Sequence, residues 1–397
     1  MSTETHTGYL TTERRMLQEA ARDFAMQEVL PLANKLDPER GDMPRSLIDK
    51  MAELGYFGIT IAEEHGGMGL GCFEYCLIAE ELARAWMSVG SVIARGNTFM
   101  GSQLLDDAQR AAIMPRVARG EYLGALALSE PATGSDLASV SCRARRDGDE
   151  WVISGNKYWC TFADGADFIF LLARTSPDVD PKRKHAGISA FIINKPRGSF
   201  PPGIAGSAIP KIGYFGWKTW ELAFDGYRLP ANALVGKEGE AFAAFSRGLE
   251  TYRAHTAARS IGLARGALED ATKYAQERVQ FDQPIANFQA IRFKLAQMAT
   301  EIEAARQLNY HVCTQIDQGQ RCDTEAAMTK LFASEMSERV CSEAMQIHGG
   351  AGYTTDYAVE RYWRDARLTK IFEGTSEIQL KIISDRMLGK LAGNATG

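Results

Sequence analysis

The stretch from residue 151 to residue 193 decides the fold. It contains WVISG (151–155), FIFLLA (168–173) and ISAFII (188–193), three short runs that are rich in β-branched and aromatic residues and are separated by polar turns. This composition and length are typical of β-strands. The same pattern extends over residues 122–235 and predicts an antiparallel β domain, with a proline- and glycine-rich surface loop at 196–206.

Helical periodicity lies on both sides of this segment. Before it, apolar residues recur at helical spacing from Met16 to Phe24, Pro31 interrupts the pattern, and residues 46–54 resume it. After Gly239, apolar positions step by three and four in narrow seams, as expected of a helical bundle. The order predicts an α+β multi-domain chain: an N-terminal helical domain at 1–121, a middle antiparallel β domain at 122–238 and a C-terminal helical bundle at 239–397.

Composition excludes several classes of protein. The 397 residues are 45% hydrophobic and 24% charged with a net charge of −5, so no basic surface for nucleic acid is expected. The chain has no apolar run of membrane-spanning length, and its polar N-terminus lacks the apolar region of a signal peptide, which predicts a cytoplasmic protein without a membrane contact. Seven cysteines without a CxxC pair predict reduced thiols, with neither a disulfide framework nor a metal site.

Two glycine clusters fail the template for nucleotide binding on a parallel sheet. GGMGLG at 66–71 lacks the third glycine of GxGxxG and follows no strand, and GGAG at 349–352 does not fit either. The predicted strands also do not alternate with helices, which disfavours a Rossmann sheet. A dinucleotide cofactor, if the chain binds one, must be held in another way.

Segments spread over nearly the whole chain resemble the acyl-CoA dehydrogenase family. They are EEHGGMGLG (63–71), ALSEPATGSD (127–136), KYWCTFADGAD (157–167), QERVQFDQPIANFQ (276–289), QIHGGAGYTTDYAVERYWRDAR (346–367) and IFEGTSEIQ (371–379). The resemblance implies a helical domain, a β domain and a C-terminal four-helix bundle, with FAD in each subunit of a homotetramer or homodimer. It also implies an acyl-CoA substrate and an electron-transferring flavoprotein as the acceptor.

Glu373 is the candidate base. The α-hydrogen of a thioester is weakly acidic, so its removal needs a positioned carboxylate and an acceptor for the departing hydride. Taken alone, Glu373 could merely favour the dipole of the following helix, where Ser376 and Gln379 have the spacing of a capping box. In the resembled family the glutamate of this motif abstracts the α-proton while the β-hydride passes to flavin N5, giving a trans-2-enoyl-CoA; it maps onto Glu373.

Other residues around the base follow from the same resemblance. Some relatives carry the base on an earlier helix, at a position that is Tyr252 here and that cannot act as a carboxylate. Arg253 matches an arginine found beside the active site, although a structural salt bridge is an equal alternative. Gly374 suits close approach of a substrate, and Ser135 is expected near the pyrophosphate or CoA.

The flavin site is assigned residue by residue on the resembling motifs. Leu128 and Ser129 are expected at the isoalloxazine, Trp159 over one face of the ring and Thr161 near N5; without the resemblance, an exposed Trp and a strand Thr would be equally good interpretations. Phe162 stands where many relatives have asparagine. A second set is expected at the pyrophosphate and adenosine of an adjoining subunit's FAD, where an arginine suits phosphate and glycines permit close approach: Arg278, Phe281, Gln289, Gln346, Gly349 and Gly350, with Thr375 and Glu377 completing it.

The segment ARAWMSVGSVIARGNTFMG at 83–101 bears on which acyl group the substrate carries. Arg84 matches the position of an arginine that recognises the distal carboxylate in glutaryl-CoA dehydrogenases, and Arg95 falls near the end of the acyl chain. Because a buried arginine needs an anionic partner, a carboxylated acyl group such as glutaryl or methylsuccinyl is one hypothesis. In the alternative, Arg95 pairs with Glu80 or Glu81 and the substrate is a short or branched acyl-CoA, a size that the bulk of Trp217 and Trp220 would favour.

Two other function classes remain open from the sequence. One is a flavin oxidase of the same fold, which would pass its electrons to oxygen. The other is a non-catalytic relative that keeps the scaffold as an interaction module. Retention of Glu373, the Trp159 and Thr161 pair and Arg278 favours an enzyme.

Overall fold

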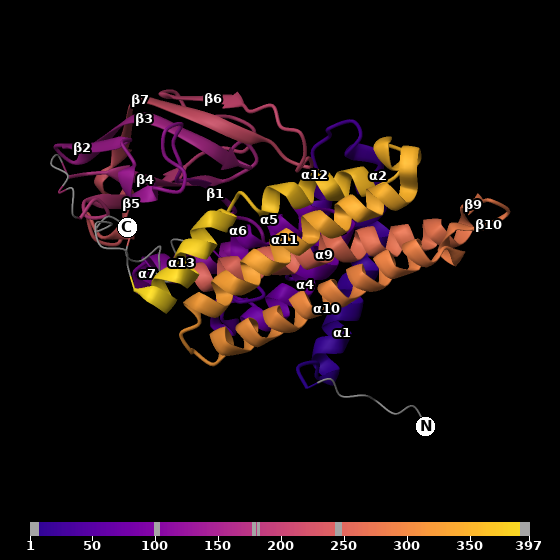
Figure 1. Ribbon diagram of the computed structural model, residues 1–397. Coiled ribbons are helices and arrows are strands. Elements are labelled where there is room, and N and C mark those ends of the chain that lie inside the picture. Colours follow the sequence, from indigo (N-terminus) through magenta and orange to yellow (C-terminus); the bar gives the residue numbers. More distant parts are fainter. Residues whose placement is uncertain (1–7, 99–103, 177–179, 181–182, 243–247, 390–397) are drawn as a thin grey trace.

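The computed structural model describes residues 8–98, 104–176, 180, 183–242 and 248–389. The outer ends of the predicted terminal domains and residues 99–101 of the acyl-group segment therefore lie outside the described residues. Helices form both ends of the chain and a sheet forms its middle, as predicted (Figure 1). None of the described helices is both long and apolar enough to cross a membrane.

The N-terminal helices surround α4, which is buried along almost its whole length. Pro31 does not interrupt the first helix as predicted, because a π-helical turn at Ala25–Val29 carries the chain from α1 into α2 and leaves Pro31 in the first turn of α2, where its missing N–H costs little. The helices are α1 (Thr12–Phe24), α2 (Leu30–Leu36), α3 (Arg45–Glu53), α4 (Cys72–Ala85), α5 (Met87–Val92), α6 (Ala94–Asn97) and α7 (Asp107–Ala118).

The middle segment forms a sheet in the order β6-β7-β3-β2-β4-β5-β8, with β1 also paired to β4. Most pairs are antiparallel, as predicted, but β1 and β2 each meet β4 in parallel. The register between β3 and β7 shifts between Lys157 and Cys160, and this irregularity turns the Trp159 side chain outward. The strands are β1 (Gly124–Ala127), β2 (Arg143–Asp147), β3 (Glu150–Thr161), β4 (Phe168–Arg174), β5 (Ile188–Asn194), β6 (Ile204–Ala208), β7 (Thr219–Pro230) and β8 (Leu234–Val235).

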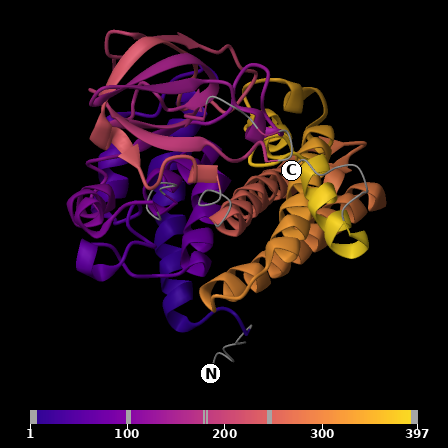
Figure 2. The ribbon, with the colours of Figure 1, turned by 90° about the vertical axis from the view of Figure 1, so that its left-hand side faces the viewer.

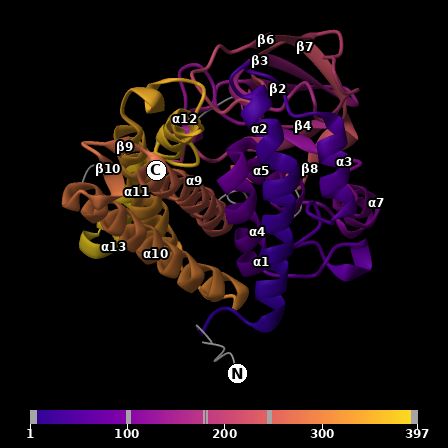
Figure 3. The ribbon, with the colours of Figure 1, turned by 90° about the vertical axis from the view of Figure 1, so that its right-hand side faces the viewer.

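The C-terminal helices pack around α9, which contacts α4, α10, α11 and α12. The bundle and the N-terminal helices thus share one core and lie side by side below the sheet (Figures 2 and 3). A short hairpin of β9 (Val279–Gln280) and β10 (Gln283–Pro284) projects from the end of the bundle farthest from the sheet (Figure 1). The helices are α9 (Leu249–Glu277), α10 (Gln289–Asp317), α11 (Asp323–His348), α12 (Val359–Thr369) and α13 (Ser376–Leu388).

All seven cysteines are buried free thiols. Cys72 and Cys76 on α4 and Cys313 on α10 form a cluster whose sulfur atoms all lie within 4.8 Å of one another. Burial raises the pKa of the isolated Cys160 thiol to about 12, which keeps it protonated.

Candidate active site

Glu373 lies in the tight turn between α12 and α13. Its φ of 53° and that of Gly374, 91°, are in the left-handed region, where a non-glycine residue is strained by about 1–3 kcal/mol. The surroundings fix this turn, because the Gly374 carbonyl accepts hydrogen bonds from Lys330 Nζ (2.7 Å) and Gln379 Nε2 (3.0 Å). The predicted capping box is therefore wrong: Thr375 caps α13 through the Ile378 N–H, and Gln379 is held by the turn instead.

The carboxylate of Glu373 is held by α9. Arg259 Nη2 donates to both carboxylate oxygens, at 2.9 and 2.8 Å, and the Thr256 hydroxyl donates to Oε2. Arg259 is 1% exposed, whereas the Glu373 side chain is 30% exposed. Burial acts to lower the pKa of Arg259, but the charge and hydrogen bond of Glu373, together with Tyr214 and Tyr75, outweigh it and raise the pKa, so Arg259 is a fixed cation beside the base.

Arg95 on α6 is the second cation of this site. Its guanidinium lies 5.2 Å from the centre of the Trp217 ring and donates a long bond of 3.4 Å to the Thr161 carbonyl, while Nε has no hydrogen-bond partner. Burial lowers the pKa of Arg95, which the charge of Glu373 partly offsets. No carboxylate of the described residues forms a salt bridge with Arg95, so the alternative pairing with Glu80 or Glu81 is wrong.

Glu80 and Glu81 are occupied by other arginines, Glu80 by Arg306 at 2.9 Å and Glu81 by Arg265. Arg84 is likewise paired, with Glu269 at 2.7 Å and Asp270 at 3.3 Å. Its place between α4 and α9 speaks against the substrate-binding role that the sequence suggested.

Tyr252 lies beside the base, as expected of a pocket residue, and its hydroxyl donates to the Thr98 carbonyl at 2.6 Å. Burial raises the pKa of Tyr252, so the phenol stays neutral. Arg253, the next residue, forms no hydrogen bond with Glu373 among the described contacts: burial lowers its pKa, and the charges of Glu250 and Asp323 partly offset this. The arginine that orients Glu373 is thus Arg259 rather than Arg253.

The predicted flavin face of the β domain is well braced. The Leu128 carbonyl accepts from the buried Lys157 ammonium (2.8 Å), and the Ser129 carbonyl accepts from the Tyr158 N–H (2.8 Å). Lys157 is in turn paired with buried Glu130 at 2.9 Å. Burial acts to raise the pKa of Glu130, but Lys157 and the hydrogen bonds from Ser141 and Cys142 together outweigh it and lower the pKa, which keeps this carboxyl ionised. The turn at 128–130 is therefore rigid, and Ser135 lies exposed beyond it.

Trp159 offers a flat aromatic face in front of this turn. It is 57% exposed and has a φ of 64°, unusual for so large a residue. The Thr161 hydroxyl lies on the same strand and shares a hydrogen bond with Thr219 Oγ1 at 3.1 Å. An exposed ring beside a hydroxyl suits one side of an isoalloxazine.

The other predicted flavin residues lie at the far end of the bundle. Arg278 follows α9, and its guanidinium has no ion-pair partner among the described residues; Phe281 in the adjoining hairpin is 87% exposed. The Tyr274 and His348 rings, 4.2 Å apart, bring the ends of α9 and α11 together, so Arg278 and Gly349 belong to one surface. A Cβ atom added at Gly349 or Gly350 would meet nothing within 4 Å.

Gln289 begins α10 and Gln346 lies in the last turn of α11, at this same end of the bundle, whereas Thr375 and Glu377 lie at the start of α13. An unpaired arginine and an open glycine turn have the chemistry that binds pyrophosphate. The end of the bundle that carries β9 and β10 lies far from the sheet, whose strand β3 carries Trp159 (Figure 1). The residue types fit FAD, but the residues for the flavin ring and those for the pyrophosphate lie in two separate places.

Sequence reasoning missed Thr256, Arg259 and Lys330. A signal for the first two exists, because Tyr252, Thr256 and Arg259 are spaced by four and three and so share one face of α9. The only feature of the sequence that marks Lys330 is its position on an otherwise apolar face of α11.

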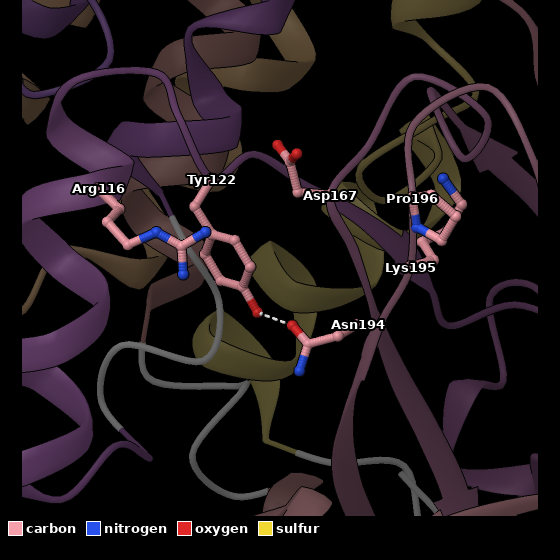
Figure 4. A pocket seen from close by; sticks show the side chains of 6 residues that line it. All are labelled: Arg116, Tyr122, Asp167, Asn194, Lys195 and Pro196. Carbon is pink, nitrogen blue, oxygen red and sulfur yellow. Dashed lines mark hydrogen bonds between the residues drawn. The ribbon is translucent and has the colours of Figure 1, made fainter.

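A shallow cavity lies elsewhere, between α7 and the β4 and β5 strands (Figure 4). Its polar groups are already paired, with the Tyr122 hydroxyl on Asn194 Oδ1 at 2.5 Å and Asp167 on Arg197 at 2.6 Å. The cavity therefore offers no unpaired group that could act as a base. Its lining residues are Arg116, Tyr122, Asp167, Asn194, Lys195 and Pro196.

The chain is similar to several known proteins. A (2S)-methylsuccinyl-CoA dehydrogenase of Cereibacter sphaeroides is 42% identical over 389 residues, which are 96% of this chain and 70% of that protein. A solved glutaryl-coenzyme A dehydrogenase in complex with glutaryl-CoA is 33% identical with a TM-score of 0.88 and covers 98% of each chain. A chain from a structural study of the electron transferring flavoprotein of Acidaminococcus fermentans is 36% identical, with a TM-score of 0.89 over 96% of this chain and 99% of that chain.

Family sequence profiles match almost the whole chain. They are the N-terminal domain of acyl-CoA dehydrogenases at residues 11–121, the middle domain at 125–227 and the C-terminal domain at 239–388. These matches cover both the helices that hold the base and the sheet that carries Trp159. The chain therefore belongs to the acyl-CoA dehydrogenases, a family of FAD-dependent oxidoreductases.

Proposed function

We propose that this enzyme dehydrogenates a short acyl-CoA that carries its own carboxylate, such as a methylsuccinyl or glutaryl thioester, to the trans-2-enoyl-CoA. The observation that carries the proposal is the imbalance of charge beside the base. Arg259 is buried and Arg95 is partly buried, and Glu373 is the only carboxylate of the described residues that is hydrogen-bonded to either of them.

An unpaired cation in the interior is costly, by several kcal/mol, unless an anion joins it. Among the described residues no carboxylate supplies that anion as a salt-bridge partner of Arg95, because Glu373 is held by Arg259 and Glu80 and Glu81 are taken by other arginines. The carboxylate of a bound acyl group would do so. The surrounding rings of Trp217, Tyr214 and Tyr252 limit the room for the acyl chain, which favours a short one. The names of the two dehydrogenase relatives above point to the same class of substrate.

In the proposed reaction, Glu373 takes the α-proton. The turn that carries it is fixed by Lys330 and Gln379, whose side chains both donate to the Gly374 carbonyl. Leu128, Ser129, Trp159 and Thr161 would hold the flavin ring, and Ser135 would lie near the pyrophosphate or CoA. The bound flavin supplies the acceptor for the hydride that leaves the β-carbon.

The second half of the cofactor site implies a further copy of the chain. Arg278, Phe281, Gln289, Gln346, Gly349 and Gly350 would serve the FAD of a neighbouring subunit, because the end of the bundle beside the β9–β10 hairpin lies far from the sheet that carries Trp159. We further propose a homotetramer or homodimer in the cytoplasm that passes its electrons to an electron-transferring flavoprotein, a proposal that the separation of the two halves and the family support.

The test is an anaerobic titration of the purified FAD-loaded protein with butyryl-, isobutyryl-, glutaryl- and methylsuccinyl-CoA, followed by the visible flavin spectrum. We expect the flavin to bleach with a carboxylated thioester. Glu373→Gln should keep FAD and lose bleaching by at least about a hundredfold, whereas Asp49→Asn, an exposed carboxylate on α3, should behave as the wild type. Equal bleaching by wild type and Glu373→Gln would refute Glu373 as the base, and bleaching by butyryl-CoA alone would refute the carboxylated substrate.

A further inference from the structure

The contacts of Glu373 pose a problem for the base that we propose. One oxygen accepts from Arg259 alone, and the other accepts from Arg259 and Thr256. A base must present an oxygen lone pair to the α-hydrogen, and here both oxygens already accept hydrogen bonds. In this arrangement Glu373 is therefore poorly placed to react.

Arg259 is the fixed member of this pair. Its Nη1 donates to the Ser91 hydroxyl at 2.8 Å, and its guanidinium lies 4.9 Å from the centre of the Phe372 ring. Glu373, by contrast, is more exposed and is followed by a glycine. When the pair separates, the carboxylate moves and the guanidinium stays.

We propose that Arg259 is a latch that makes the base responsive to the substrate's own carboxylate. A carboxylated acyl group takes the place of Glu373 on Arg259, with Arg95 as the second cation, and the released Glu373 turns to the α-hydrogen. An acyl group without a carboxylate leaves Glu373 paired and reacts slowly. This inference rests on the proposed function and adds how that site selects its substrate.

The charges support the exchange. Before binding, two guanidiniums face one carboxylate; afterwards they face two, so the incoming anion neutralises the site while it frees the base. The exchange also limits the length of the acyl chain. The same guanidinium must reach the base beside the α-carbon and the distal carboxylate, which places that carboxylate close to the reacting carbons, as in a four- or five-carbon diacid.

The first test measures binding rather than turnover, by calorimetry with the FAD-loaded protein. Glu373→Gln removes the competing anion from Arg259, so this variant should bind glutaryl- or methylsuccinyl-CoA about tenfold or more tightly than wild type, while its affinity for butyryl-CoA stays the same. In an Arg259→Gln background, the substitution of Glu373 should no longer change the affinity for the carboxylated thioester. Equal affinities of wild type and Glu373→Gln for the carboxylated thioester would overturn the latch.

The second test measures selectivity in the rate of flavin bleaching. Arg259→Gln should slow the reaction with the carboxylated thioester and speed that with butyryl-CoA, so that their ratio falls by about a hundredfold, and Arg259→Lys should restore part of it. A merely structural role of Arg259 would slow both substrates alike, and that outcome also overturns the proposal. If Arg259→Gln does not fold, the binding comparison with Glu373→Gln still decides. Failure of the proposed function is seen separately, as an absence of bleaching with every carboxylated thioester.

Discussion

The ammonium group of Lys330 on α11 lies 2.7 Å from the carbonyl oxygen of Gly374, the residue that follows the proposed base. Lys330 is buried, and burial lowers its pKa to about 8 although the charge of Glu373 acts in the opposite direction. A cation whose burial is costly thus donates a hydrogen bond to the backbone of the turn that carries the proposed base. Its contact holds a turn of two residues with positive φ in place.

We expect Lys330→Met to loosen this turn. The free energy of unfolding should fall by about 1 kcal/mol, near the low end for a lost buried hydrogen bond, because Gln379 still donates to the same carbonyl. The rate of flavin reduction should fall about tenfold or more, since small displacements of a base are costly. Denaturant unfolding and stopped-flow absorbance measure the two effects. Lys381→Met, an exposed lysine of α13, should change neither, and an unchanged rate in Lys330→Met would contradict the role given to this contact.

Arg95→Met should affect acyl-CoA substrates that carry a carboxylate differently from those that do not. The substitution removes the cation that has no carboxylate partner, while Met keeps most of the apolar contact with Trp217. We expect KM for the carboxylated thioester to rise about tenfold to a hundredfold, as for a lost charged hydrogen bond, and KM for butyryl-CoA to stay the same or fall. Steady-state kinetics with an artificial electron acceptor give both values. An equal rise for both substrates would show that Arg95 acts only through packing.

Asp365 on α12 makes stability depend on pH. Burial, and then the neighbouring charge of Asp37, raise the pKa of Asp365 to about 7, while its Oδ1 accepts the Tyr214 N–H at 2.5 Å. The pKa of Asp365 is higher in the folded protein than in the unfolded chain. Protonated Asp365 therefore favours folding at low pH, and this contribution to the free energy of unfolding is lost as the pH rises through about 7. Asp365→Asn keeps the acceptor but cannot ionise.

Thermal unfolding between about pH 5 and pH 8.5 checks this linkage. The wild type should lose stability relative to Asp365→Asn as the pH rises, and the two should approach each other at the acid end. Asp49→Asn, at an exposed position, serves as the control and should follow the wild type throughout. Parallel curves for wild type and Asp365→Asn would show that Asp365 does not titrate in this range.

Arg278→Gln should weaken FAD binding. Its unpaired guanidinium can give two charge-assisted bonds to a pyrophosphate, and losing them should lower the affinity for FAD about tenfold to a hundredfold. The fluorescence of FAD released on dilution measures this loss. Arg321→Gln, where the arginine is exposed and paired with Asp323, should retain FAD like the wild type. Equal retention by Arg278→Gln would argue against a cofactor role for this end of the bundle.

The sequence predicted the architecture better than the contacts of the site. Periodicity separates helix from strand because it depends on neighbouring residues, so the α, β, α order was correct. The identity of the residue that holds Glu373 depends instead on which face of α9 meets the turn after α12. Arg253 and Arg259 are six residues apart and lie on different faces of that helix, and the motif alone could not distinguish them.

The prediction for Arg84 failed because it, too, depended on how two helices pack. Its partners Glu269 and Asp270 lie on α9, far along the chain, and the packing of α4 against α9 is not visible in either segment alone. The predictions for Pro31 and for the Ser376 capping box failed for a more local reason: a π-helical turn precedes Pro31, and Gln379 donates to the nearby Gly374 carbonyl instead of capping the helix.

The burial of every cysteine gives the protein an internal reporter of its own opening. A thiol-modifying reagent in water reaches none of the seven sulfur atoms until a helix or strand moves away, so the rate of labelling measures how often that part of the fold opens. Cys142 and Cys160 would report on the sheet, and the cluster of Cys72, Cys76 and Cys313 on the contact between α4 and α10. Labelling followed by mass spectrometry would therefore show whether the sheet and the helices come apart together or one after the other, without any substitution in the chain.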